Sequence, residues 1–213
     1  MNNHFAKIVA NVVAILATIT TLFVSGCTDP ATIPTGSGRL GYEQAAFKDN
    51  VQTNSNVVEF PQTFIDSQGR LVDLNQLKGR KVLLVVLRGM PLSENGDFCP
   101  SCLAQTGGLL TNREEFEKRG AEVLLLFPGP SDRVGEFIET ARQQTPGEPS
   151  FTFRLLLDKD LKTCTSLGIR ADLAKPSTYI LDRKGRVTFA YVGETSTDRP
   201  SVKAVLSQLD RAP

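Results

Sequence analysis

Histidine is almost absent from this sequence: the only one is His4, close to the N-terminus. A closed structural zinc site needs four cysteine or histidine ligands. The four cysteines, Cys27, Cys99, Cys102 and Cys164, have no histidine to join them in the body of the chain, so we expect no metal. The same lack excludes a Cys–His catalytic dyad and the histidine ligand of a copper chaperone. We expect no other cofactor.

An excess of charge of either sign is also missing. Lysine and arginine number 24 and aspartate and glutamate 23, which gives a formal net charge of +1. This neutral balance gives no reason to expect a nucleic acid or another polyanion as a partner. Internal repeats are not visible, and the length suits one domain with its own core.

The N-terminal hydrophobic run, residues 8–23, is shorter than the about 20 residues that a membrane-spanning helix needs. It follows a short basic segment and precedes the small residues of Val24-Ser25-Gly26-Cys27. This order is typical of a secretory signal peptide. An uncleaved anchor helix and a plain signal peptide with a chance cysteine are the alternatives, and both would also export the domain.

Val24-Ser25-Gly26-Cys27 resembles the lipobox of bacterial lipoproteins. The resemblance implies that residues 1–26 are a signal peptide and that Cys27 is lipidated and becomes the mature N-terminus. The lipid would anchor the protein on the extracytoplasmic (periplasmic) side of a membrane in the bacterial cell envelope. Residues 27–56 are rich in Thr, Gly, Pro, Ser and Asn without periodicity, which predicts a flexible tether. The folded domain is then residues 57–213.

The three cysteines that remain are odd in number, which argues against a disulfide scaffold and for one working pair. Cys99-Pro100-Ser101-Cys102 lies between a strand-like apolar run, 81–87, and a helical pattern, 103–118. A cysteine at a helix N-terminus faces unpaired N–H groups and the positive end of the helix dipole. Both favour the reactive thiolate, and a second thiol one turn later can close a disulfide. Dithiol redox chemistry is therefore the leading hypothesis.

Strand and helix patterns alternate through the domain. Apolar runs and turn signals predict strands at 64–66, 71–74, 81–87, 122–127, 151–157, 177–181 and 187–192. Helices are predicted from residue 101 and at 131–144, 160–167 and 200–209. This order predicts an α/β fold with a mixed central sheet that is flanked by helices on both faces.

The run 64–70, the strand before the C-x-x-C and Lys175-Pro176-Ser177-Thr178-Tyr179-Ile180-Leu181-Asp182 resemble the thioredoxin fold. Residues 116–123 and Asp198-Arg199-Pro200-Ser201 are similar to the redoxins of the alkyl hydroperoxide reductase/thiol-specific antioxidant (AhpC/TSA) family. The resemblance covers residues 57–209. It implies that Pro176 lies against the C-x-x-C with a cis peptide bond, and that the backbone of Lys175 binds a thiol or peptide substrate. Only about 5–6% of X–Pro bonds are cis, and a trans proline that starts an edge strand is the alternative.

The sequence departs from the family at the peroxide-binding residues. Typical peroxiredoxins carry P-x-x-x-T-x-x-C, in which the Thr hydroxyl binds the peroxide. Three residues before Cys99 stands Gly96, and seven before it stands Leu92, with Pro91 one residue further away. Ser93 is a candidate replacement for the missing hydroxyl.

Two arginines, Arg88 and Arg170, are candidates for the catalytic arginine of the family. Cys164 falls in a short helical pattern, where a free cysteine usually acts as a small buried hydrophobe. A role for Cys164 as the resolving thiol would need it near Cys99, which the predicted topology does not suggest.

From these observations we predict that the protein is a membrane-tethered, extracytoplasmic thiol–disulfide oxidoreductase. Cys99 would attack a substrate disulfide as the thiolate, and Cys102 would resolve the mixed disulfide, which leaves the pair oxidised. A thiol-dependent peroxidase with Cys99 as the peroxidatic cysteine is the alternative, and a non-catalytic interaction module with a structural disulfide is a third. The expected partners are a protein disulfide or a peroxide, an unidentified thiol electron donor, and the membrane.

Overall fold

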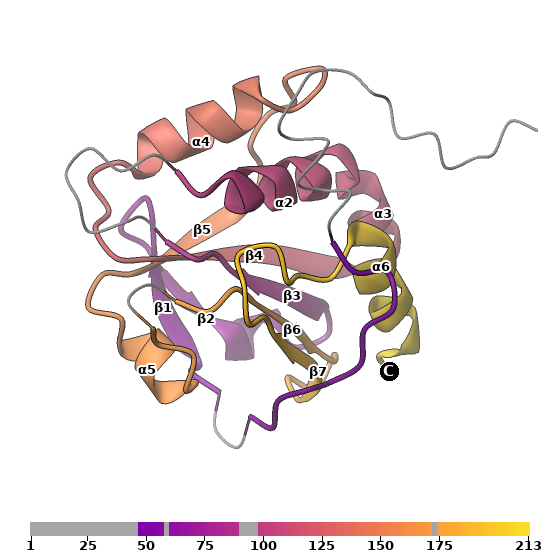
Figure 1. The fold of residues 1–213 in the computed structure, drawn as a ribbon. Helices are drawn as coiled ribbons and strands as arrows, with labels where there is room; N and C mark the ends of the chain where they lie inside the picture. The colour runs from indigo at the N-terminus through magenta and orange to yellow at the C-terminus, as the bar shows by residue number, and fades with distance from the viewer. Residues whose placement is uncertain (1–46, 58–59, 90–97, 172–173) are drawn as a thin grey trace, which may run out of the picture. The chain divides into compact units, whose positions relative to one another are not determined.

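The computed structural model describes residues 47–57, 60–89, 98–171 and 174–213, all of which belong to one compact unit that spans residues 34–213 (Figure 1). Its elements are, in chain order, β1 (Thr63–Asp66), β2 (Leu71–Asp73), the 3-10 helix η1 (Leu74–Leu77), β3 (Lys81–Val86), α2 (Pro100–Thr111), α3 (Arg113–Lys118), β4 (Ala121–Pro128), α4 (Val134–Gln143), β5 (Arg154–Asp158), α5 (Lys162–Ser166), β6 (Ser177–Leu181), β7 (Val187–Val192) and α6 (Val202–Arg211).

The seven strands form one mixed sheet in the order β2-β1-β5-β4-β3-β6-β7. Strands β3, β4 and β5 run parallel at its centre, and the outer strands pair with them and with each other in antiparallel fashion. All six residues of β3 are buried. A continuous apolar strand is typical of a parallel sheet whose two faces are both covered.

Helices cover both faces of the sheet (Figure 1). Successive side chains of a strand point to opposite faces, so β3 contributes to two separate cores. Leu83 and Val85 pack in the core that also contains residues of α2, α3, α4 and α6. Leu84 and Val86 pack in the core that contains residues of η1 and α5. The predicted α/β class, with a mixed sheet between helical layers, is confirmed.

The turns of the two hairpins, β1–β2 and β6–β7, are held by the same set of hydrogen bonds to an aspartate. In the first, the buried Asp66 carboxylate accepts backbone N–H groups of Gln68 and Arg70 and binds the Arg70 guanidinium. In the second, Asp182 accepts the N–H of Lys184 and Arg186 and binds the Arg186 guanidinium. Burial alone would raise the pKa of both carboxyls, but these hydrogen bonds outweigh it and lower the pKa.

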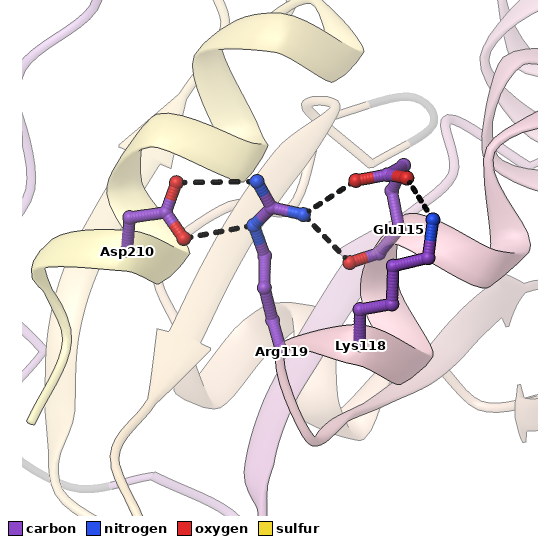
Figure 2. Close-up of polar contacts among 4 residues, drawn as sticks. All are labelled: Glu115, Lys118, Arg119 and Asp210. Carbon is purple, nitrogen blue, oxygen red and sulfur yellow. Dashed lines mark hydrogen bonds and ion pairs between the residues drawn. The ribbon is translucent and has the colours of Figure 1, made fainter.

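A polar network joins the C-terminal helix to α3 (Figure 2). The guanidinium of Arg119, the residue that caps α3, donates to both carboxylate oxygens of Asp210 on α6, at 2.8 and 3.3 Å. It also donates to the carbonyl and the carboxylate of Glu115, and Lys118 donates to the other carboxylate oxygen of Glu115. The network fixes the C-terminal end of α6, whose N-terminal end follows the loop 193–201.

The structure differs from the sequence prediction at the end of α2 and in the segment before residue 57. The helix predicted to continue to residue 118 breaks at Asn112, whose side-chain amide donates to the carbonyl of Gly108 and so ends α2. Residues 47–56 were expected in the tether, but this segment packs on the domain: Val51 is buried in the core and Lys48 bridges to Pro200.

Within the described ranges, no helix is long and apolar enough to cross a membrane. The predicted signal peptide, Cys27 and residues 27–46 of the predicted tether lie outside these ranges.

Candidate active site

Cys99 and Cys102 lie at the beginning of α2, close to the chain that leaves the end of strand β3. Cys99 is the N-cap residue and is half-buried, Pro100 occupies the first turn, and Cys102 is only 2% exposed. The carbonyl of Cys99 accepts the N–H groups of Cys102 and Leu103, at 2.9 and 3.1 Å, which begins the helix. No disulfide joins them in this structure.

The two thiols are electrostatically unequal. A hydrogen bond from the Cys102 S–H lowers the pKa of Cys99 to about 5, helped by the charge of Arg199 and by the backbone N–H groups of Cys102 and Ser101, against the opposing effect of burial. Burial raises the pKa of Cys102, and donation of its proton to Cys99 raises it further. At neutral pH the pair therefore consists of a Cys99 thiolate and a Cys102 thiol.

A buried guanidinium, that of Arg199, lies on this pair. Its side chain is 1% exposed, and its Nη2 donates to the Sγ of Cys102 at 3.2 Å. Nη1 donates to the side-chain oxygen of Gln105, one turn further along α2, and Nε donates to the carbonyl of Ser196 at 2.6 Å. A buried charge normally has an ionic partner. Among the described residues the guanidinium of Arg199 donates to two neutral oxygens and a sulfur, and its positive charge lowers the pKa of Cys99.

The arginines proposed from the sequence have other positions. Arg88 is exposed and contributes its backbone N–H, which donates to the Sγ of Cys102 at 3.2 Å. Arg170 lies near Thr165, at 3.5 Å between Nη1 and Oγ1, and acts on the buried Cys164 instead. The guanidinium at the pair belongs to Arg199. In the sequence, Arg199 stands in the stretch Asp198-Arg199-Pro200-Ser201, which resembles the AhpC/TSA family. That stretch does not indicate that Arg199 contacts the cysteine pair.

The expected cis peptide bond before Pro176 is wrong, because the described residues contain no cis peptide bond. The backbone N–H of Lys175 donates to the carbonyl of Ile169 at 2.8 Å, which guides the chain into β6 in the extended trans form. The carbonyl of Lys175 accepts a hydrogen bond from the Ser177 hydroxyl at 3.0 Å. The side-chain ammonium of Lys175 pairs with Glu194 at 2.9 Å. The polar groups of Lys175 that the resemblance assigns to substrate are thus engaged within the protein. Pro176 lies before an interior strand and not before an edge strand.

Cys164 lies on the opposite face of the sheet from the pair. Cys102 belongs to the core beneath α2 and Cys164 to the core beneath α5, with the sheet between them. Burial raises the pKa of Cys164, and its hydrogen bond with Asp158 raises it further. Cys164 is therefore an inert core thiol in this arrangement, as expected from the sequence.

The positions that bear on the missing threonine, Gly96, Leu92, Pro91 and Ser93, lie outside the described residues. Within the part of the chain that is described, no group of three or more His, Cys, Asp or Glu side chains could hold a metal ion.

A thiolate at a helix N-terminus with a buried thiol one turn later is the machinery of a thiol oxidoreductase, here on a thioredoxin-like α/β sheet. The model of the AhpC/TSA family matches residues 53–190, more than half of the chain, and the chain belongs to this family.

Individual relatives agree with this assignment. The chain is 30% identical over 133 residues to the chloroplastic peroxiredoxin Q of Oryza sativa subsp. japonica, which covers 61% of this chain and 54% of that protein. It is 29% identical over 135 residues to peroxiredoxin Q of Sedum lineare, covering 62% and 64%. The chain thus spans about half to two thirds of the length of these curated relatives.

Solved structures share the fold at low identity. A mutant of peroxiredoxin 6 of Arenicola marina superposes with a TM-score of 0.61 at 14% identity, over 76% of this chain and 73% of that chain. Peroxidoxin BcpB from Mycobacterium tuberculosis gives a TM-score of 0.54 at 19% identity, over 76% and 98%.

Proposed function

We propose that this chain is a thiol peroxidase that is held by a lipid on Cys27 at the extracytoplasmic side of a bacterial membrane. The observation that carries the proposal is the buried Arg199 guanidinium, 3.2 Å from the sulfur of Cys102 and beside a Cys99 thiol whose pKa is about 5. The sequence alone favours disulfide exchange, because it has a C-x-x-C, has Gly96 where the family has the peroxide-binding threonine, and offers no secure match to the catalytic arginine of the family. Arg199 supplies a guanidinium at the thiol pair, and for this reason we place the peroxidase first.

The reaction follows from the unequal pair. The Cys99 thiolate attacks one oxygen of the peroxide, the O–O bond breaks, and the leaving oxygen takes a proton and departs as water or an alcohol. Cys99 is then a sulfenic acid. The Cys102 thiol attacks the sulfur of Cys99, water leaves, and a Cys99–Cys102 disulfide forms. A thiol electron donor on the same side of the membrane reduces the disulfide and restores both thiols.

Arg199 has two tasks in this scheme. Its charge favours the thiolate before attack, since an opposite charge within a few ångströms favours the ionised form. In the proposed reaction its charge would also stabilise the negative charge that develops on the departing oxygen, as a preorganised donor in a buried site does. The peroxiredoxin names of the relatives support the same substrate class.

The test is a stopped-flow measurement of the reduced full-length chain with hydrogen peroxide. We expect a rate constant orders of magnitude above that of a free thiolate with the same pKa. Cys99→Ser should abolish the reaction, and Cys102→Ser should stop it at a Cys99 sulfenic acid that dimedone traps. Cys164→Ser is the matched control and should react like the unmodified chain. A rate typical of a free thiolate would refute the peroxidase proposal.

Reduction of a protein disulfide is the second candidate, and the accessibility of the pair favours it. Cys99 is half-buried at the helix N-terminus, so a protein thiol can reach it, while the fully enclosed Cys102 can attack a mixed disulfide from within. The same stopped-flow series with a model protein disulfide distinguishes the two candidates. Rapid disulfide reduction together with an ordinary peroxide rate would make this chain a thiol–disulfide oxidoreductase.

A further inference from the structure

Residues 47–54, which we name the strap, begin beside the end of the loop 193–201 that carries Arg199 and continue past α6 to β7 (Figure 1, indigo). The N–H of Lys48 donates to the carbonyl of Arg199 at 2.8 Å, and the N–H of Ser201 donates to the carbonyl of Lys48 at 2.9 Å. Further along the strap, Asn54 exchanges two side-chain hydrogen bonds with the backbone of Val192. The strap is therefore bonded to the chain on both sides of this loop.

The side chain of Lys48 adds an ion pair to this backbone contact. Its Nζ lies 2.7 Å from Oδ1 of Asp198 and donates to the Tyr191 hydroxyl at 3.1 Å. The same hydroxyl donates to Asp198 at 2.6 Å, and the second carboxylate oxygen accepts the N–H of Glu194 at 3.0 Å. The Asp198 side chain is only 15% exposed, whereas the Lys48 side chain is 52% exposed, so only the carboxylate of this pair is shielded from solvent.

The ion pair matters to the thiols because it neutralises Asp198, which would otherwise attract the Arg199 guanidinium. Asp198 is the residue before Arg199, and Arg199 is the only cationic residue in the loop 193–201. Without the Lys48 ammonium, Asp198 would keep only the neutral donors Tyr191 and Glu194 N–H. The nearest cation along the chain would then be Arg199 itself, whose attraction to Asp198 would compete with its contact to sulfur.

We propose that Lys48 is a positioning residue for the thiol pair: by neutralising Asp198 and holding the backbone of Arg199, it keeps the Arg199 guanidinium on the sulfur of Cys102. The inference rests on the proposed role of Arg199. The range matched by the family model, 53–190, contains neither Lys48 nor Arg199, so the coupling is drawn from the contacts of this chain alone.

The test is the pH profile of iodoacetamide alkylation of Cys99 in the reduced full-length chain, read by peptide mass spectrometry. Among the described residues, the groups that lower the pKa of Cys99 are the Cys102 thiol, the charge of Arg199 and the backbone N–H groups of Cys102 and Ser101. Lys48→Met removes the charge while the backbone bridge can remain. We expect the midpoint of the profile to move to higher pH, and the rate at pH 6 to fall about three- to tenfold, in the range of coupling between contacting groups. Lys48→Arg should restore the original profile, and Lys48→Met should have no further effect in an Arg199→Gln background.

Lys203→Met is the matched control, because Lys203 also pairs with the strap, at Asp49 (3.1 Å), through a carboxylate other than Asp198. It should leave the midpoint unchanged. An unshifted midpoint in Lys48→Met, or an equal shift in Lys203→Met, would overturn the inference. Should Arg199→Gln fail to fold, the comparison of Lys48→Met with Lys48→Arg decides. Alkylation needs no substrate, so a shifted profile without peroxide reduction would refute the proposed function and leave this inference intact.

Discussion

Replacement of Arg199 by glutamine tests whether its buried charge makes Cys99 reactive. The guanidinium Nη2 is 3.2 Å from the sulfur of Cys102, and its charge also acts on Cys99. An opposite charge at such range lowers a pKa by about 1–3 pH units. Arg199→Gln should therefore raise the pKa of Cys99 from about 5 to between about 6 and 8. At pH 6 the thiolate fraction would fall from about nine tenths to about one tenth in the middle of that range.

The assay is again alkylation of Cys99 as a function of pH, in which the rate at pH 6 should fall about tenfold, in proportion to the thiolate fraction. Arg113→Gln is the control, since Arg113 is a partly exposed arginine on α3 that pairs with Glu117. Thermal unfolding checks the fold: the Gln105 oxygen loses its donor at a cost of about 1–3 kcal/mol, which relief of a buried charge partly offsets. A folded Arg199→Gln protein with an unchanged alkylation midpoint would refute the role assigned to this guanidinium.

Three further outcomes are expected. Cys27→Ser should release the protein from the membrane fraction or leave it as an uncleaved precursor; normal processing with retained membrane binding would contradict lipidation. Asp182→Asn should cost about 1–3 kcal/mol at pH 7. Because the folded-state pKa of Asp182 is lowered, its contribution is present above the ordinary value of 3.8 and is lost as the pH falls through the folded-state pKa, so the two urea-unfolding curves should converge in acid. Arg119→Met should destabilise the Figure 2 network slightly, and high salt should remove the difference.

The sheet and the position of the C-x-x-C could be predicted from the sequence because their signals are local. The strand at β3 is a continuous apolar run, and the β6–β7 hairpin surrounds a turn with Asp182 and Gly185 at fixed spacing. The helix that follows Cys99 is equally local, since Pro100 suits its first turn. The break at Asn112 was missed because a polar residue with good helix formers on both sides gives little warning that its side chain will compete for the carbonyl of Gly108.

Arg199 could not be assigned from the sequence because its partner is distant. It contacts Cys102 across 97 positions, and it lies in a loop that has no hydrophobic periodicity to fix its direction. Arginines closer to the pair in the chain, such as Arg88, were the natural candidates, yet the end of β3 directs only the backbone of Arg88 to the sulfur. The strap was missed for a related reason. Its composition is that of a linker, and only the loop 193–201 supplies the carbonyl and carboxylate that order Lys48.

Burial of the pair favours different chemistry at its two sulfurs. Cys102 is enclosed by α2, Arg199 and the end of β3, so a protein substrate meets the half-buried Cys99. A peroxide is small, and its departing oxygen carries a compact negative charge that a nearby guanidinium stabilises well. The leaving sulfur of a protein disulfide is larger and more diffuse, and it departs toward solvent with its own protein. In the proposed reaction, the charge of Arg199 beside the inner sulfur therefore gives its greatest benefit to a small substrate, which is why the guanidinium supports our proposal of peroxide over a protein disulfide.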